Sequence, residues 1–292
     1  MASPPRYVYA FLAIGLVAAS QSGNLVRVGD AHPAVMAAWR LLLASLIMAA
    51  LAGPRLRELA GLSRTEKWLA FLAGAALSAH LMTWIAAVQR TTVANAAIFF
   101  STNPVITAIA AHLIYGERIT LRLFASVVLG LAGVAVIGLD DFHLSAESAS
   151  GDAFSLLCSF FFTAYFMFGK RVRAKLDNRA YVTAVYGSAA LCSFAAAAAL
   201  GLPVLEQSAR NWLCFVLLAI IPTSVGHTAL NAALRYMDAS RISAATLSEP
   251  VLAGLVAWWA WGEAARPSAF AGYSLIACSV VVLVWDEFRG VR

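Results

Sequence analysis

Ten apolar runs, each about twenty residues long, follow one another along the chain and leave little of it for anything else. A helix rises 1.5 Å per residue, so about twenty apolar residues are needed to cross the roughly 30 Å hydrocarbon core of a bilayer. Charged residues make up only 12% of the chain, whereas a soluble domain carries about 25%. We therefore predict an all-α membrane protein with ten transmembrane helices.

Proline, glycine and clusters of charge mark the ends of the runs. The predicted spans of the first half cover 7–26, 33–52, 67–88, 93–115 and 120–138. Those of the second half cover 153–170, 180–200, 211–233, 240–261 and 267–285. The chain thus divides into a first five-helix unit (7–138), an acidic extracytoplasmic linker (139–152) and a second five-helix unit (153–285).

Lysine and arginine orient the predicted bundle. Ten crossings put both termini on one side, and sixteen of the basic residues then fall on that side. Only four fall in the loops of the other side, and Arg40 lies within a span. Basic residues gather on the cytoplasmic side of a membrane, so we predict N-in and C-in in the cell inner (cytoplasmic) membrane. The net charge of +6 reflects this bias, and no nucleic-acid partner is expected.

The two halves of the chain are related in sequence by a shift of 146 positions. The shift aligns Asn103-Pro104 with Glu249-Pro250, and the Gly-Glu pair at 116–117 with the one at 262–263. Between Pro104 and Val136, ten positions match without a gap. Each half holds five spans, an odd number, so the second copy enters the membrane upside down. Inverted repeats of this kind are a recurring transporter architecture, with the substrate site between the repeats.

A proline in the fourth helix, Gly-Glu at its end and an arginine early in the second helix (A-W-R-L at 38–41) resemble the drug/metabolite transporter superfamily, EamA type. The resemblance covers 8–138 and 151–285 and is greatest to exporters of aromatic and other neutral amino acids. It implies that the first four helices of each repeat line a cavity and that the fifth is a scaffold. The second repeat departs from the pattern, because Tyr186 stands where Arg40 stands in the first.

Polar side chains are costly in hydrocarbon and are expected to face a cavity or a partner helix. In the third span, His80, Thr83 and Trp84 share one helical face. We interpret this face as a cavity wall where His80 hydrogen-bonds a substrate and Trp84 stacks on it, with interhelical packing as the alternative. In the fourth span, Phe99 and Asn103 are further candidates for contact with substrate.

The same alternatives apply to the second half. Tyr165 in the sixth span, His227 and Asn231 in the eighth and Thr246 in the ninth are candidates for substrate binding. For Tyr165, which belongs to an aromatic stripe, packing is the simpler explanation, and stacking on an aromatic substrate is the functional one. For Arg40, binding of a substrate carboxylate competes with a structural role beside a bent helix, which we favour.

Two prolines are expected to open room for a ligand. Pro104 removes a backbone hydrogen bond and leaves the carbonyl of Phe100 without its partner, and Pro250 acts similarly in the ninth span. Directly before Pro250, Glu249 lies about 12 Å along the helix from Arg241, near the centre of the bilayer. It is a candidate for coupling transport to protons or for binding a substrate ammonium, and a protonated structural residue is the alternative.

Together these features predict a secondary transporter that exports aromatic and other neutral amino acids, or similar amphipathic metabolites, by alternating access. The expected partners are an amino-acid substrate and the lipid bilayer, and a monomer is expected to suffice. There is no GxxxxGK[ST] loop to bind ATP, so a gradient must drive transport. The four cysteines have no CxxC spacing and the histidines are scattered, so no metal or cofactor is expected.

Three alternatives remain at this stage. A phosphate-ester or nucleotide-sugar carrier on the same fold should need several intramembrane Lys or Arg residues, and the spans contain only Arg40. An intramembrane enzyme would need a nucleophile with a partner His or a metal motif, and neither is present as a recognisable motif. A passive channel would show flux that does not saturate with substrate.

Overall fold

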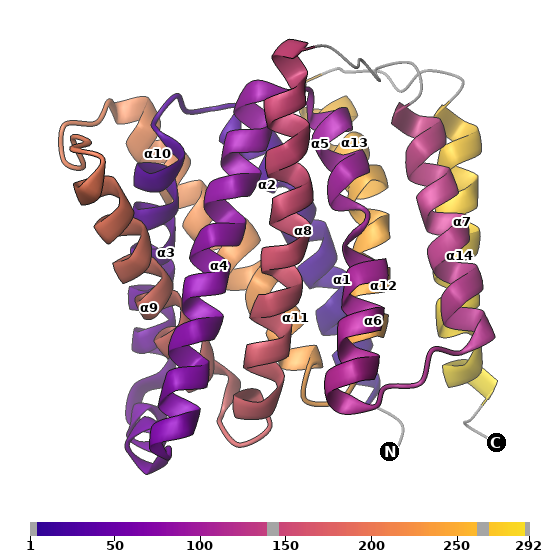
Figure 1. The fold of residues 1–292 in the computed structure, drawn as a ribbon, viewed down its shortest axis with the longest axis horizontal. Helices are drawn as coiled ribbons and strands as arrows, with labels where there is room; N and C mark the ends of the chain where they lie inside the picture. The colour runs from indigo at the N-terminus through magenta and orange to yellow at the C-terminus, as the bar shows by residue number, and fades with distance from the viewer. Residues whose placement is uncertain (1–4, 139–145, 262–268, 290–292) are drawn as a thin grey trace.

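The computed structural model describes residues 5–138, 146–261 and 269–289, and every regular element in these ranges is a helix (Figure 1). The first half comprises α1 (Arg6–Ser20), α2 (Ser22–Val26), α3 (Pro33–Ala52), the 3₁₀ helix η1 (Gly53–Gly61), α4 (Arg64–Arg90), α5 (Val93–Phe100), α6 (Asn103–Tyr115) and α7 (Leu121–Gly138). The second half comprises α8 (Ala146–Arg173), α9 (Asn178–Ala199), α10 (Ala209–Leu218), the π-helix η2 (Ala219–His227), α11 (Thr228–Ala233), α12 (Ala239–Ala245), the 3₁₀ turn η3 (Thr246–Ser248), α13 (Glu249–Trp261) and α14 (Ala269–Arg289).

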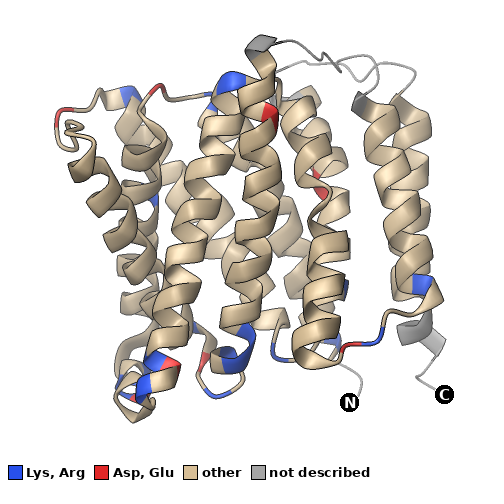
Figure 2. Ribbon diagram, in the orientation of Figure 1, with Lys and Arg blue, Asp and Glu red and all other residues tan. Residues whose placement is uncertain are grey.

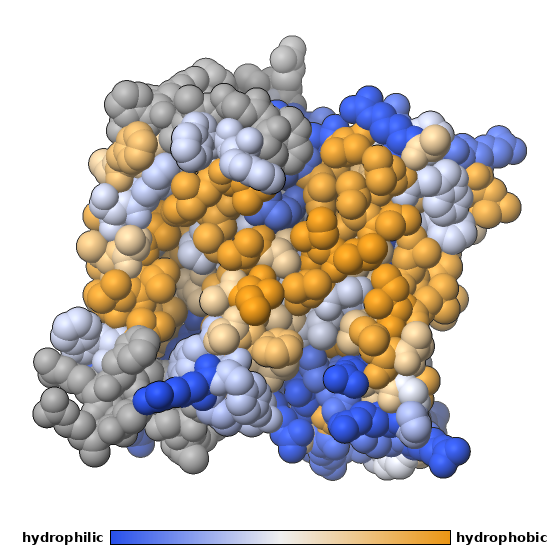
Figure 3. Space-filling view, turned by 180° about the vertical axis from the view of Figure 1, so that it is seen from behind, coloured by the Kyte–Doolittle hydropathy of each residue, from blue (hydrophilic) through white to orange (hydrophobic). Residues whose placement is uncertain are grey.

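The helices stand side by side, and α1 begins at the same edge of the bundle at which α14 ends (Figure 1). We call this edge the terminal side. Most Lys and Arg lie at the terminal side, and the middle of the bundle carries few charges (Figure 2). On the face seen in Figure 3, hydrophobic side chains form a band between hydrophilic margins. Such a band matches the hydrocarbon core of a bilayer.

Seven helical segments of the described chain are long and apolar enough to cross a membrane, and α7 and α14 contribute two shorter apolar helices. The predicted ninth span, 240–261, is divided among α12, η3 and α13. The structure is therefore that of a polytopic helical membrane protein.

Two segments have a helical structure that the sequence analysis did not describe. Residues 146–152 of the predicted linker are helical and form the start of α8, while 139–145 lie outside the described residues. The hydropathy pattern did not reveal this extension because a helix that projects beyond the membrane has polar turns. The first predicted span is also interrupted, since α1 ends at Ser20 and α2 begins at Ser22.

Proline positions coincide with three interruptions. At Pro104 the structure has a break between α5 and α6 at Ser101 and Thr102, and the proline lies in the first turn of α6. The Phe100 carbonyl, which Pro104 deprives of an amide, accepts from Asn103 Nδ2 at 3.2 Å and Ser159 Oγ at 3.0 Å. The predicted loss of the backbone bond is thus compensated by side chains.

The second half is interrupted in the same way. Pro222 lies inside the π-helix η2, and the Leu218 carbonyl accepts from Thr223 Oγ1 at 2.8 Å. Before Pro250, the chain tightens into η3, where the Glu249 amide donates to the Thr246 carbonyl. Irregular backbone at membrane depth is tolerated where it lines a cavity or is buried in protein.

The helix bounds recur with the same shift as the sequence. α6 runs from 103 to 115 and α13 from 249 to 261, so both ends differ by 146. α5 begins at 93 and α12 at 239, which is again 146. The interruption at 101–102 therefore has a counterpart at 246–248.

Helices α7 and α14 pack against each other through small residues. Ser279 Oγ donates to the Ser126 carbonyl at 2.7 Å, and a Cβ on Gly272 would lie 2.6 Å from the Gly133 carbonyl oxygen. Only glycine allows this backbone approach. The shift of 146 positions takes Ser126 to Gly272 and Gly133 to Ser279, so the two contacts are counterparts. Because the earlier residue of α7 meets the later residue of α14, the two helices run antiparallel.

Candidate functional site

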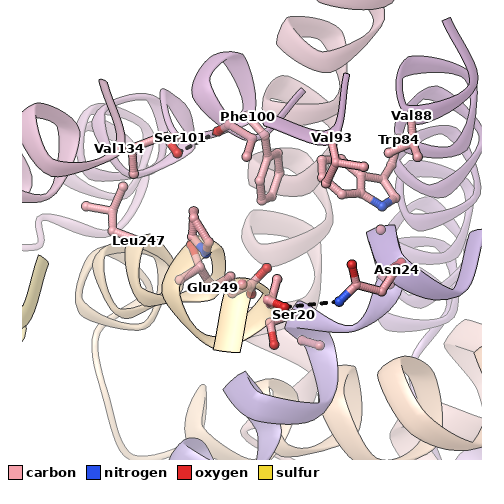
Figure 4. A pocket seen from close by; sticks show the side chains of 18 of the residues that line it. Ser20, Asn24, Trp84, Val88, Val93, Phe100, Ser101, Val134, Leu247 and Glu249 are labelled. Atoms are coloured by element: carbon pink, nitrogen blue, oxygen red, sulfur yellow. Dashed lines mark hydrogen bonds between the residues drawn. The ribbon is translucent and has the colours of Figure 1, made fainter. Parts of the chain in front are cut away.

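A cavity of about 660 Å³ lies between the halves of the bundle and is lined from nearly every part of it (Figure 4). α1 and α2 contribute Ser20, Ser22 and Asn24, α4 contributes His80 and Trp84, α5 contributes Phe100, α8 contributes Phe162 and η2 contributes His227. Asn103 of α6, Thr246 and Leu247 of η3, Glu249 and Pro250 of α13, Val134 and Ile137 of α7, and Tyr273 of α14 complete this part of the wall. Residues distant in sequence thus form one concave site.

Aromatic rings form a continuous wall of this cavity. The ring of Trp84 lies 5.5 Å from that of Phe100, measured between centroids, and Phe100 lies 5.7 Å from His80. Phe162 completes the cluster at 5.1 Å from His80. These separations are typical of interacting aromatic pairs, so the wall is a packed surface that a flat ligand can lie against.

The two histidines meet at the cavity. Their ring centroids are 5.8 Å apart, and both side chains are buried. His80 Nδ1 lies 3.1 Å from the Cys158 carbonyl oxygen. The same nitrogen lies 3.1 Å from Cys158 Sγ, so Cys158 of α8 fixes the orientation of the ring. His227 Nδ1 has no hydrogen-bond partner among the described residues.

Polar groups gather at the paired helix interruptions. Asn103 Nδ2 donates to Thr246 Oγ1 at 3.4 Å, and Ser243 Oγ donates to Asn103 Oδ1. Ser243 Oγ also lies 3.2 Å from Thr107 Oγ1. These bonds join α6 to α12 and η3 beneath the cavity, so the two interruptions are held together.

Among the described residues that line the cavity, Glu249 is the one with an acidic side chain. It begins α13, directly after the η3 interruption, and is half-buried. Figure 4 shows it near Ser20, across the hollow from Phe100 and Trp84. No hydrogen bond or ion pair joins its carboxylate to another described residue.

Not every residue predicted for the site reaches the cavity. His80, Trp84, Asn103, His227, Thr246, Glu249 and Pro250 line it, whereas Thr83, Phe99, Pro104, Tyr165 and Asn231 do not. Tyr165 and Asn231 are fully buried and bonded to each other. Thr83 Oγ1 donates to the Ala79 carbonyl of its own helix at 2.7 Å. These side chains bond within or between helices and lie outside the cavity wall, so their contact with substrate stays a prediction.

Phe100 and Phe162 line the cavity although the sequence did not single them out. Three consecutive phenylalanines, 160–162, precede the Tyr165 turn, and helical periodicity allows more than one of them to face inward. In the structure Phe162 is 2% exposed and Phe160 is 51% exposed. The sequence contained one signal for Phe100: Pro104 leaves the Phe100 carbonyl without an amide partner, so the helix is interrupted there.

Arg40 lies outside the cavity wall. It is fully buried on α3, where Nε donates to Thr223 Oγ1 at 2.6 Å and a guanidinium nitrogen donates to Ser22 Oγ at 3.0 Å. Tyr186, its counterpart under the shift, reaches the same π-helix and donates to the Thr223 carbonyl at 3.2 Å. Both residues support the irregular backbone of η2, which agrees with the structural role favoured from sequence.

The cavity opens away from the terminal side. Its lining includes Arg27 and Thr92, which are exposed at the ends of α2 and α5 remote from the chain termini (Figure 1). Toward the terminal side the chain is closed. There Tyr115 Oη donates to the Met167 carbonyl at 2.5 Å, and the end of α6 meets the end of α8 and the start of α12.

Glu117 is the centre of this closure. Gly116 ends α6 in the left-handed conformation, with φ of 67°. The Glu117 carboxylate then accepts from the Ala239 amide at 3.0 Å and from Ser240 Oγ at 2.6 Å, and it forms an ion pair with Lys170. Burial alone would raise the pKa of Glu117, but these hydrogen bonds and the Lys170 charge outweigh burial and hold it below its usual value.

Among the described residues there is no group of three or more His, Cys, Asp or Glu side chains that could hold a metal ion. A multi-helix membrane bundle with a polar and aromatic cavity between its halves is an architecture common among membrane transporters. The chain belongs to the EamA-like transporter family, whose sequence model matches residues 7–139 and again 149–285.

Two similar proteins carry transporter names. An uncharacterized transporter of Archaeoglobus fulgidus is 28% identical over 70% of this chain and 71% of its own, and the uncharacterized transporter YdfC of Bacillus subtilis is 28% identical over 86% and 82%. The chloramphenicol-sensitive protein RarD of Pseudomonas aeruginosa is 28% identical over 65% and 60%. A protein of known crystal structure, 18% identical, superposes with a TM-score of 0.79 over 99% of this chain and 100% of that chain, which shows the fold alone.

Proposed function

We propose that this transporter exports aromatic and other neutral amino acids across the cytoplasmic membrane by alternating access. In this proposal, ten crossings form two inverted five-helix repeats, 7–138 and 153–285, with both termini in the cytoplasm. Substrate binds between the repeats, where the interrupted helices meet.

Three observations support the topology. α7 and α14 run antiparallel through contacts that are counterparts under the 146-residue shift. The family model matches the chain twice, once in each half. Most basic residues lie at the terminal side (Figure 2), as expected if that side is cytoplasmic.

The composition of the cavity wall is the observation that supports the proposed class of substrate. Trp84 and Phe100 provide ring faces, Asn103 and Thr246 provide hydrogen-bonding groups, and Glu249 provides one carboxylate. An aromatic amino acid has matching parts, namely a ring and a small polar head. A phosphate ester would need several cations, and Arg27 at the rim is the single Lys or Arg among the described lining residues.

The closure around Glu117 fits one end state of an alternating-access cycle. The cavity opens on the side away from the termini, and Glu117, Lys170 and the start of α12 close the terminal side. In the proposed orientation, the described conformation faces outward. Export then requires the Glu117 contacts to separate so that substrate can enter from the cytoplasm.

Flux from proteoliposomes tests this function. Purified protein is reconstituted with radiolabelled phenylalanine, tryptophan or threonine inside, and efflux is followed at increasing internal concentration. We expect efflux that saturates and is fastest for the aromatic substrates. Flux equal to that of protein-free liposomes for every amino acid would refute the function, and flux that rises without saturation would indicate a channel.

Glu249 is our proposed coupling residue for protons. An unpaired carboxylate in an enclosed cavity can exchange a proton with whichever side the cavity faces. Coupling predicts that an imposed pH gradient accelerates efflux at saturating substrate in the parent protein. Glu249→Gln cannot titrate, so its remaining flux should be the same with and without the gradient. An equal response of variant and parent to the gradient would leave Glu249 with a structural role.

A further inference from the structure

The cavity has an uneven distribution of charge. Among the described lining residues, Arg27 is the one Lys or Arg and Glu249 is the one Asp or Glu. Arg27 is exposed at the rim, where water screens its charge. Glu249 lies within the enclosed part, and none of the described residues offers it an ion pair. The interior of the site therefore presents a carboxylate without a protein counter-ion.

The aromatic wall also favours a cation over an anion. The faces of Trp84 and Phe100 carry the negative part of the ring quadrupole and attract cations, most strongly where water is excluded. Figure 4 shows both rings across the hollow from Glu249. A positively charged group between them would be attracted from both sides.

The enclosed part of the described wall has no comparable cationic partner for an anion. Arg40 is a buried cation that donates to Thr223 and to Ser22 of the wall, and its second terminal nitrogen, which has no described partner, is covered by protein. Two ring nitrogens of the wall, Trp84 Nε1 and His227 Nδ1, have no hydrogen-bond partner, but both atoms are buried by surrounding protein. A substrate carboxylate would thus lose its water and gain no charged partner, which is costly.

We infer that the amino group is the part of the substrate that this site recognises, and that the carboxylate is dispensable. The site then takes arylalkylamines as well as aromatic amino acids, with the ammonium group at Glu249 and the ring against Trp84 and Phe100. The inference rests on the proposed use of this cavity as the substrate site.

Three ligands that share a phenyl ring and a two-carbon chain test it. L-Phenylalanine carries both charges, 2-phenylethylamine lacks the carboxylate and 3-phenylpropionate lacks the amine. Binding to the purified full-length protein in detergent is measured as the ligand-dependent rise in unfolding temperature, titrated to give Kd. We expect 2-phenylethylamine to bind at least as tightly as phenylalanine, and 3-phenylpropionate to bind about tenfold to one hundredfold more weakly, the value of a charge-assisted hydrogen bond.

Variants at Glu249 identify the group responsible. Glu249→Gln should weaken both amine-bearing ligands by a similar factor and leave 3-phenylpropionate unchanged or tighter. Glu249→Asp keeps the charge and should keep the order of affinities. Glu206→Gln, the same change at an exposed residue, is the matched control. Should the Gln variant not fold, the ligand series on the parent protein still decides the question.

The outcomes separate this inference from the proposed function. If phenylalanine leaves liposomes but 3-phenylpropionate binds as well as 2-phenylethylamine, the inference is wrong and export stands. If no amino acid is transported while the amine binds in a Glu249-dependent manner, export is wrong and amine recognition stands. Equal binding of all three ligands, or of none, overturns the inference.

Discussion

Trp84 presents its ring to the cavity while its indole nitrogen is buried without a described partner. The side chain therefore offers a substrate stacking and not a hydrogen bond. Stacking of this kind contributes about 0.5–1.5 kcal/mol beyond burial, which corresponds to roughly a 2- to 13-fold change in affinity.

Trp84→Ala should accordingly weaken transport of phenylalanine by that factor more than transport of threonine. The measurement is the ratio of kcat/KM for the two amino acids in proteoliposomes. Trp259→Ala removes an indole that is 84% exposed on α13 and should leave the ratio unchanged. Equal losses for both amino acids in the Trp84 variant would assign the ring to packing.

Single residues also mark how far the sequence alone reaches. His80, Trp84 and Glu249 were predicted as candidates because a polar or aromatic group in a span needs a reason to be there, and all three line the cavity. Tyr165 and Asn231 met the same criterion, yet Asn231 Nδ2 donates to Tyr165 Oη across 66 residues and neither side chain lines the cavity. The sequence shows which polar residues fall within apolar spans and must therefore be costly to bury. It does not show which distant residue will bond to them and offset that cost.

At the scale of helices, the Gly-Glu pair at the end of α6 has two separate roles. Gly116 ends its own helix, and Glu117 caps α12 in the other half, 122 residues away. The role of the glycine follows from local conformation, so sequence predicted that the pair ends a helix. The capping partner depends on tertiary packing and was not predictable.

The Glu117 contacts predict a pH dependence of stability. Its pKa is below the usual value in the folded protein, so its contribution is present above the unfolded pKa of about 4.3 and is lost as pH falls through the folded pKa. Glu117→Gln should lower stability at neutral pH by about 1–3 kcal/mol and flatten its decline below about pH 4.3. Thermal unfolding in detergent from neutral to acidic pH measures both effects.

The control for that experiment is Glu206→Gln, at an exposed loop residue, which should follow the parent at every pH. Parent and Glu117→Gln curves that remain parallel through the acidic range would show that the Glu117 carboxylate does not contribute to folding through its charge.

Helix interruptions were easier to predict than their form. Each proline removes an amide in any helix, so a disturbance near Pro104, Pro222 and Pro250 follows from sequence. The outcome differs among the three: a break at Ser101 and Thr102, a π-helix, and a 3₁₀ turn. Which form results depends on the side chains that reach the freed carbonyls, such as Ser159 from a separate helix.

At the scale of the molecule, we predict that both termini lie in the cytoplasm. α8 runs from the side remote from the termini to the terminal side. In a cysteine-free background, Ser150→Cys should react with a membrane-impermeant maleimide in intact cells, and Ala174→Cys should react only after the cells are opened. Both positions are exposed. The reverse pattern would place the termini outside the cytoplasm.

The buried Arg40 bond links the architecture to the order in which the chain is made. Its acceptor Thr223 lies 183 residues later, and ribosomes add about 5–20 residues per second. Roughly 10 to 40 seconds therefore pass between the synthesis of the guanidinium and that of the hydroxyl that receives it. A charged side chain in a span costs about 2.5–3.5 kcal/mol on insertion scales, so the early helices are least stable in lipid during that interval. Ser22, which precedes Arg40 in the chain, is then the one of its two hydroxyl partners already made.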